Sequence, residues 1–198
     1  MAVAFLTALT VHEYAHARAA LAQGDDTALR AGRVSLNPID HLDPLGTIMF
    51  VFMMLSGFGI AWGKPVPVNP MRFKSPRWGN LKVSLWGPFS NVLFACVLSI
   101  LLRVMVQQGI FMSYKPLVET CVLLNLMLAI FNLIPIPPLD GSHILSSLLP
   151  YDQARRYDYF MGRYGMIILI GLLLSRVLGS IIWPPVVILF KLLTGLAY

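Results

Sequence analysis

The sequence predicts an all-α, polytopic membrane helix bundle of about five to six hydrophobic segments, within one integral-membrane domain over residues 1–198. Hydrophobic residues make up 57% of the chain and charged residues 12%, whereas a soluble domain carries about a quarter charged residues. The mean hydropathy is +0.72. Apolar runs near the length of about 20 residues needed to span a bilayer occur at 1–22, 44–62, 83–102, 117–134, 164–180 and 181–198.

Three connecting stretches do not fit a helical pattern. Residues 23–43 carry several turn signals and are expected to form a polar loop. Residues 63–70 contain three prolines, which remove backbone donors and fix φ, so this stretch is expected to be extended and to lie near the active site. Prolines within 134–141 directly follow an apolar run and are expected to end its helix abruptly.

The basic residues bear on whether segment 44–62 crosses the membrane. If it spans fully, one side holds eight basic residues, Lys64, Arg72, Lys74, Arg77, Lys82, Arg155, Arg156 and Arg163, and the other holds Arg30, Arg33, Arg103 and Lys115. If it is re-entrant, Arg30 and Arg33 change sides, and the count of ten against two fits the positive-inside rule better. Gly46, Gly57 and Gly59 would help such a bend, whereas the length of the segment favours a full span. Both alternatives stay open.

The net charge of +6 does not predict a nucleic-acid partner. The basic residues fall in short loops between apolar runs, as expected next to a lipid bilayer. No continuous basic face is present, so we expect no nucleic-acid binding.

Residues 12–16, His-Glu-Tyr-Ala-His, form an H-E-x-x-H motif inside the first apolar run. On a helix, His12 and His16 share one face, so both imidazoles can reach one ion. Zinc binds neutral histidine nitrogens, and Glu13 is placed to take a proton from water. A metal would also stabilise ionisable groups that are costly at membrane depth. The alternative is that the histidines face a loop and the helix begins after them.

A hydrolytic zinc site needs a third protein ligand and an open position. Glu119 and Asp140 are the carboxylates in or beside the later apolar segments. Asp140 is the better candidate because it lies where prolines end a helix, and irregular backbone at membrane depth is tolerated beside a wet cavity. If the first helix ends near residue 22, His16 lies about 9 Å below the basic face, level with Asp140. The alternative role for Asp140 is a turn or helix cap.

The chain resembles the site-2 protease family of intramembrane zinc metalloproteases. The resemblance rests on the H-E-x-x-H motif, on Asn132 to Gly141 (Asn-Leu-Ile-Pro-Ile-Pro-Pro-Leu-Asp-Gly) and on Gly87 to Asn91 (Gly-Pro-Phe-Ser-Asn). Residues 32–47 and 63–68 resemble a compact prokaryotic branch, without the PDZ insertion or nucleotide-sensing module of other members. These motifs cover most of residues 11–150.

The resemblance implies that His12, His16 and Asp140 bind one Zn²⁺ per chain and that Glu13 is the general base. It implies cleavage within or near a transmembrane helix of a membrane-anchored substrate, releasing a regulatory fragment, often after an upstream protease has trimmed the substrate. It also implies a multi-pass protein of the prokaryotic inner or plasma membrane. Relatives often have a further apolar segment before the motif helix, so the helix count and an upstream extension of the native chain stay open.

Two asparagines have two interpretations each. The resemblance points to Asn132 as a group that contacts the substrate backbone or the developing oxyanion, and Asn91 invites the same role. The alternative for both is a structural hydrogen bond between helices, and for Asn91 we favour packing with Gly87. His41 is expected to be structural, and His143 to face water or cap a helix rather than bind metal.

Two other functions fit parts of the pattern. A membrane transporter would use buried His, Glu and Asp as an ion path and would show flux without cleavage. A non-catalytic relative would bind membrane helices but could lack Glu13, which this chain keeps. Peptide hydrolysis fits more of the pattern, and the extended stretch at 64–68 would offer a strand edge to an unwound substrate.

Overall fold

The computed structural model describes residues 1–56, 61–175 and 177–196, and its regular elements are helices. They are α1 (Ala2–Ala22), α2 (Thr27–Arg30), α3 (Pro44–Ser56), α4 (Pro76–Gln108), α5 (Lys115–Asn132), α6 (Asp140–Leu148), α7 (Tyr151–Leu174) and α8 (Val177–Thr194), with 3-10 turns η1 (Pro38–His41), η2 (Pro70–Arg72) and η3 (Met112–Tyr114). Within the described residues, four helical spans are long and apolar enough to cross a membrane. The predicted all-α membrane bundle is therefore confirmed.

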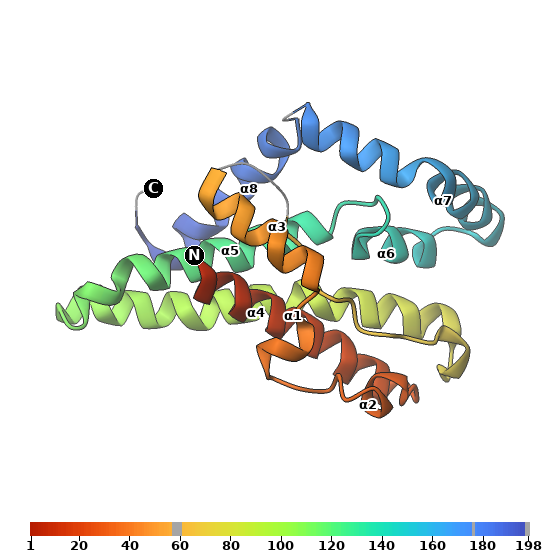
Figure 1. Cartoon of the computed structure of the whole chain (residues 1–198), viewed down its shortest axis with the longest axis horizontal. Coiled ribbons are helices and arrows are strands. Elements are labelled where there is room, and N and C mark those ends of the chain that lie inside the picture. The colour runs from red at the N-terminus through yellow and green to blue at the C-terminus, as the bar shows by residue number, and fades with distance from the viewer. Residues whose placement is uncertain (57–60, 176, 197–198) are drawn as a thin grey trace.

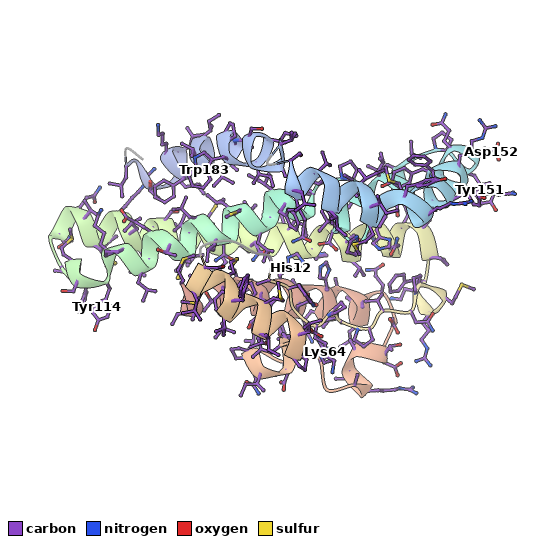
Figure 2. All side chains as sticks on the ribbon, turned by 45° about the horizontal axis from the view of Figure 1, so that its top comes forward. His12, Lys64, Tyr114, Tyr151, Asp152 and Trp183 are labelled. Carbon is purple, nitrogen blue, oxygen red and sulfur yellow. The ribbon has the colours of Figure 1, made fainter. Side chains whose placement is uncertain are left out.

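The hairpin of α4 and α5 forms the centre of the molecule (Figure 1). The helix α1 packs against both of these helices, α8 packs mainly on α5, and α6 lies against α4. The main apolar core joins α5 to the two last helices through side chains such as Leu126, Leu169 and Phe190. Tyr114, in the connection between α4 and α5, and Tyr151, at the start of α7, lie at opposite ends of the molecule (Figure 2).

Small side chains bring α1 close to the hairpin. Ala8, Ala17 and Ala20 are buried, and small residues let helix backbones approach closely inside a membrane. At Gly87 of α4, an added Cβ would collide with the imidazole of His16 and would lie 2.7 Å from His12 Cε1. This contact fixes the H-E-x-x-H motif against α4.

The described parts of segment 44–62 bear on whether it crosses the membrane. The helix α3 has 13 residues, about 20 Å of helix, whereas the hydrocarbon core is about 30 Å thick. Leu42 and Gly63 form an antiparallel bridge, so the two ends of the segment lie side by side. The residues that precede and follow the segment are therefore at the same depth, which favours the re-entrant alternative. The bend expected at Gly57 and Gly59 lies outside the described residues.

Two helices begin earlier than their apolar runs. The helix α7 begins at Tyr151 rather than near 164, and α4 begins at Pro76 rather than near 83. Arg155, Arg156 and Arg163 therefore lie on a helix, not in a loop as predicted. The reason is that a helix satisfies its own backbone hydrogen bonds, so polar side chains can continue it beyond the hydrocarbon.

Candidate metal centre and active site

Two histidines from α1 and one carboxylate from α6 converge at the middle of the molecule. His12 Nε2 and His16 Nε2 are 3.0 Å apart, and Asp140 Oδ2 lies 3.2 Å from the first and 3.3 Å from the second. The ligand atoms of the three residues all lie within 4.8 Å of one another. Asp140 follows His16 by 124 positions and His12 by 128, and the three residues present their donor atoms to one point.

The hydrogen bonds of the two imidazoles decide which nitrogens carry protons. His16 Nδ1 lies 2.9 Å from the carbonyl oxygen of Val83, which can only accept, so His16 donates from Nδ1. His12 Nδ1 lies 2.7 Å from Asn91 Oδ1. The orientation of Asn91 follows from its Nδ2, which donates to the carbonyl oxygen of Ala8 at 2.9 Å. When both histidines are neutral, each therefore directs an Nε2 lone pair at the shared point.

Three lone-pair donors facing one another repel unless a cation lies between them. Asp140 Oδ2 is buried without a hydrogen-bond partner among the described residues, although buried polar atoms are normally paired. Imidazole nitrogen and carboxylate oxygen are preferred zinc ligands, and three protein ligands leave a fourth position open. The residues present therefore fit a catalytic zinc ion.

A buried asparagine pair supports His12 from behind. Asn91 and Asn125 are both fully buried, and Asn91 Nδ2 also donates to Asn125 Oδ1 at 2.9 Å. Asn125 Nδ2 donates in turn to the carbonyl oxygen of Cys121 at 2.8 Å. The relay links α1, α4 and α5 and leaves the polar atoms of Asn91 engaged within the protein, which favours its structural interpretation.

The turn before α6 presents Asp140 to the histidines. Asp140 is the first residue of α6, and the residue before it provides the N-cap position without a side-chain bond. Gly141 is required here because an added Cβ would collide with the carbonyl oxygens of Leu133 and Ile134. The Tyr157 hydroxyl donates to the carbonyl oxygen of Pro135 at 2.8 Å and supports the turn from α7.

Glu13 lies at the same pocket but is held by a different part of the chain. Its Oε2 accepts the backbone N–H of Val66 at 2.9 Å. Residues 64–69, which precede η2, run beside α1 as the extended stretch that the prolines predict. The carboxylate of Glu13 is buried and lines a pocket of about 280 Å³ together with His12, His16 and Asp140.

The remaining candidates lie around this pocket or away from it. Asn132 and His143 line the pocket, and Asn132 Nδ2 donates to Leu128 of its own helix at 3.0 Å. His143 is exposed and is not part of the three-residue group. Glu119 is paired with Lys115 at 2.7 Å at the start of α5. His41 is fully buried, and its Nε2 lies 2.8 Å from the Ser35 carbonyl oxygen.

Sequence reasoning missed Asn125, the Val83 carbonyl and the contact between Val66 and Glu13. Asn125 could have been noticed, because a polar side chain inside an apolar run needs a partner at membrane depth. The other two groups are backbone atoms, and nothing in their side chains predicts a role at the site.

The helical membrane fold and the group of His12, His16 and Asp140, which could hold a metal ion, fit a membrane-embedded metallopeptidase. The model of peptidase family M50 matches residues 107–172. A protein named as a zinc metalloprotease, YwhC of Bacillus subtilis strain 168, is 37% identical over 190 residues, which is 93% of this chain and 84% of the relative. The chain belongs to peptidase family M50 and is an intramembrane zinc metalloprotease.

Two further relatives carry the same activity in their names. A zinc metalloprotease of Methanocaldococcus jannaschii is 36% identical over 95 residues, covering 48% of this chain and 26% of the relative. The zinc metalloprotease Rip2 of Mycobacterium tuberculosis strain H37Rv is 28% identical over 190 residues, covering 95% of this chain and 71% of the relative. No solved structure matches this chain significantly. Proteases of this family act on membrane-bound substrates.

Proposed function

We propose that His12, His16 and Asp140 hold the single zinc ion of the chain and that Glu13 is the general base of peptide-bond hydrolysis. The observation that carries this proposal is the convergence of two Nε2 lone pairs and the unpartnered Asp140 Oδ2 at one point. When bound, zinc supplies Lewis acidity that polarises a carbonyl and makes water a stronger acid. Residues 1–198 would act as one domain.

The chain's own residues account for the proton transfers. Glu13 takes a proton from water as the water oxygen bonds to the scissile carbonyl carbon, and it returns a proton to the nitrogen when the C–N bond breaks. Asn132 lines the same pocket, and one of its two amide hydrogens remains available to the substrate carbonyl or oxyanion. Asn91 would act through His12, not on the substrate.

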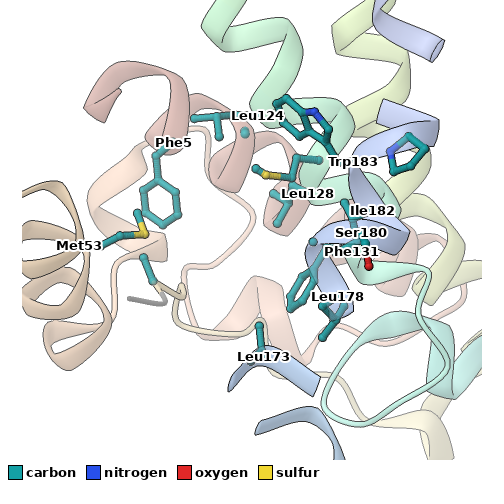
Figure 3. Close-up of a pocket in the computed structure, with 15 residues that line it drawn as sticks. Phe5, Met53, Leu124, Leu128, Phe131, Leu173, Leu178, Ser180, Ile182 and Trp183 are labelled. Atoms are coloured by element: carbon teal, nitrogen blue, oxygen red, sulfur yellow. The ribbon is translucent and has the colours of Figure 1, made fainter. Parts of the chain in front are cut away.

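A transmembrane helix of the substrate would approach through an apolar groove. A cavity of about 890 Å³ is lined by side chains of α1, α5 and α8, among them Phe5, Leu128 and Trp183 (Figure 3). The groove reaches Ala8, one helical turn before His12, and Phe131, next to Asn132. An apolar helix lying here would be next to the catalytic pocket and, once unwound, could pair its backbone with the edge at 64–68.

The substrate would be a single-span membrane protein cut to release a regulatory fragment, and an upstream protease would first shorten it. These statements extend the membrane-bound substrates of the family to this chain. The protein would then lie in a prokaryotic inner or plasma membrane.

The test is cleavage of single-span substrates by the reconstituted protein and by the Glu13→Gln variant. Loss of general base catalysis should reduce cleavage by about 10²-fold or more, while zinc content stays at one per chain because the ligands are unchanged. Glu119→Gln is the matched control, since Glu119 pairs with Lys115 away from the pocket. Equal cleavage by wild type and Glu13→Gln, or ion flux by a wild-type protein that cleaves nothing, would contradict the proposal.

A further inference from the structure

The sequence motif at 32–47 contains none of the proposed catalytic residues. Its Arg33, however, contacts the extended segment that lies against Glu13. We call residues 64–69 the strap; its first residue, Lys64, is labelled in Figure 2, and its Pro65, Val66 and Val68 line the same pocket as His12. Arg33 is buried, and its guanidinium donates from Nη2 to the Lys64 carbonyl oxygen at 2.5 Å and from Nη1 to the Pro65 carbonyl oxygen at 3.3 Å. One side chain thus holds two consecutive carbonyl groups.

The strap is also held at its other donors. The Lys64 N–H donates to the His41 carbonyl oxygen at 2.9 Å, and the Asn69 N–H donates to Asp25 Oδ2 at 2.6 Å. Burial would raise the pKa of the Asp25 carboxyl, but hydrogen bonds from Asn69 and Thr27 and the charge of Arg72 hold that pKa below its usual value. The carboxylate therefore stays charged at neutral pH and keeps the end of the strap fixed.

The alternation of prolines gives the strap a single usable register. Lys64, Val66 and Asn69 each precede a proline, which favours extended backbone at these positions. Arg33 holds the consecutive carbonyl groups of residues 64 and 65 together, so regular alternation applies only after them. In an extended chain, alternate residues direct their N–H and C=O groups to opposite edges, which puts Val66 and Val68 on one edge. A slip by one residue would place Pro65 or Pro67 against Glu13, and neither has an N–H to donate.

In the observed register, the backbone polar groups of the strap that are still free to bond a substrate lie on the edge that faces Glu13. Val66 donates its N–H to Glu13. Val68 N–H has no hydrogen-bond partner among the residues that the structure describes, and neither do the Val66 and Val68 carbonyl oxygens. The opposite edge has proline at 65 and 67 and so lacks donors there. A substrate strand can therefore find both a donor and acceptors only on the Glu13 side.

We propose that Arg33 is a positioning residue that sets the register of the strap, so that Val66 is held on Glu13 and Val68 faces the unwound substrate. This proposal rests on the proposed function, from which the unwound transmembrane helix is taken as the substrate. Arginine suits this role because its rigid fork can bond two acceptors at once, whereas lysine offers a single point charge.

The variant Arg33→Lys keeps the charge and removes the fork. In the full-length, zinc-loaded protein, we expect hydrogen exchange of the Val66 and Asn69 amides to rise about tenfold, as for the loss of one charge-assisted hydrogen bond. With a fluorescently labelled synthetic single-span helix as the probe, we expect KM to rise about tenfold and kcat to change less. Arg30→Lys is the matched control, because Arg30, the last residue of the neighbouring helix α2, is exposed and bonds Asp26.

Hydrogen exchange and KM together distinguish failure of this proposal from failure of the proposed protease function. Unchanged exchange at Val66 in Arg33→Lys would overturn the register role whether or not the protein cleaves the probe. Faster exchange with unchanged KM would show that Arg33 supports structure only, which also overturns the proposal. A wild-type protein that holds zinc but cleaves no probe would contradict the proposed function instead, while the exchange measurement would still test the register.

Discussion

At the scale of single residues, the chemistry of His12 depends on groups that never touch the metal position. The Oδ1 atom of Asn91 accepts from His12 Nδ1, and this bond keeps the Nε2 lone pair directed at Asp140. Such outer partners fix the tautomer and ring orientation of a ligating histidine. Asn91 is itself held by hydrogen bonds to Ala8 and Asn125. The imidazole of His12 is therefore oriented before a metal ion binds.

Replacing Asn91 with alanine tests this support. We expect the zinc affinity of Asn91→Ala to fall by about 10–100-fold, because His12 loses the partner that orients it. The measurement is competition for zinc against a chelator of known affinity. Ser99→Ala is the control in the same helix, since the Ser99 hydroxyl is buried but bonds only its own helix at Ala95. An Asn91→Ala protein with wild-type zinc affinity would exclude the orienting role.

At the scale of elements, the short helix α6 carries Asp140, the proposed third ligand, and its position must be fixed for the three residues to converge. Its C-terminal carbonyl groups lack partners within the helix. Arg77 at the start of α4 satisfies two carbonyl oxygens there, donating to Ser147 at 2.7 Å and to Leu149 at 2.5 Å. The position of Asp140 therefore depends on the packing of α6 against α4.

Removing the Arg77 side chain should lower the zinc affinity of the site without changing a proposed ligand. Arg77→Ala loses restraint of about 1 kcal/mol on α6, so we expect zinc affinity to fall by roughly threefold to tenfold. Zinc competition measures the change, and thermal unfolding should show a lower transition. Arg156→Ala, an exposed arginine on α7, should leave both values unchanged. Equal losses in the two variants would indicate a general effect of charge.

At the scale of the whole molecule, the re-entrant segment determines which loops share a side of the membrane. The Leu42–Gly63 bridge joins the loop before α3 to the residue that directly precedes the strap. Arg103 and Lys115 lie near η3, at the opposite end from Tyr151 (Figure 2). The arrangement agrees with the count of ten basic residues against two.

Side-specific labelling tests this topology. In a protein with Cys96 and Cys121 replaced by alanine, we expect Ile39→Cys and Met71→Cys to react with a membrane-impermeant thiol reagent from one side. Tyr114→Cys should react from the other side. All three native residues are exposed, so detergent-solubilised protein, in which each should react, is the control. Reaction of Ile39→Cys and Met71→Cys from opposite sides would contradict the re-entrant segment.

Much of the fold follows from local sequence. Apolar runs of spanning length predict helices, the spacing of His12 and His16 puts them on one face, and the prolines of 63–70 exclude a helix there. Each of these properties depends on a residue and its near neighbours along the chain, which is why the sequence predicts them. The early starts of α4 and α7 escaped prediction because polar residues can continue a helix once its backbone bonds are satisfied.

The sequence by itself thus determined the helical membrane bundle, the paired histidines with Glu13 beside them, and an extended stretch at the prolines. Only the tertiary structure decided that Asp140 meets the histidines, that Asn91 donates a hydrogen bond to Asn125, and that the Val66 N–H donates to Glu13. These contacts join residues 34 to 128 positions apart. Their geometry depends on how several helices pack at once, and no local pattern of side chains encodes that packing.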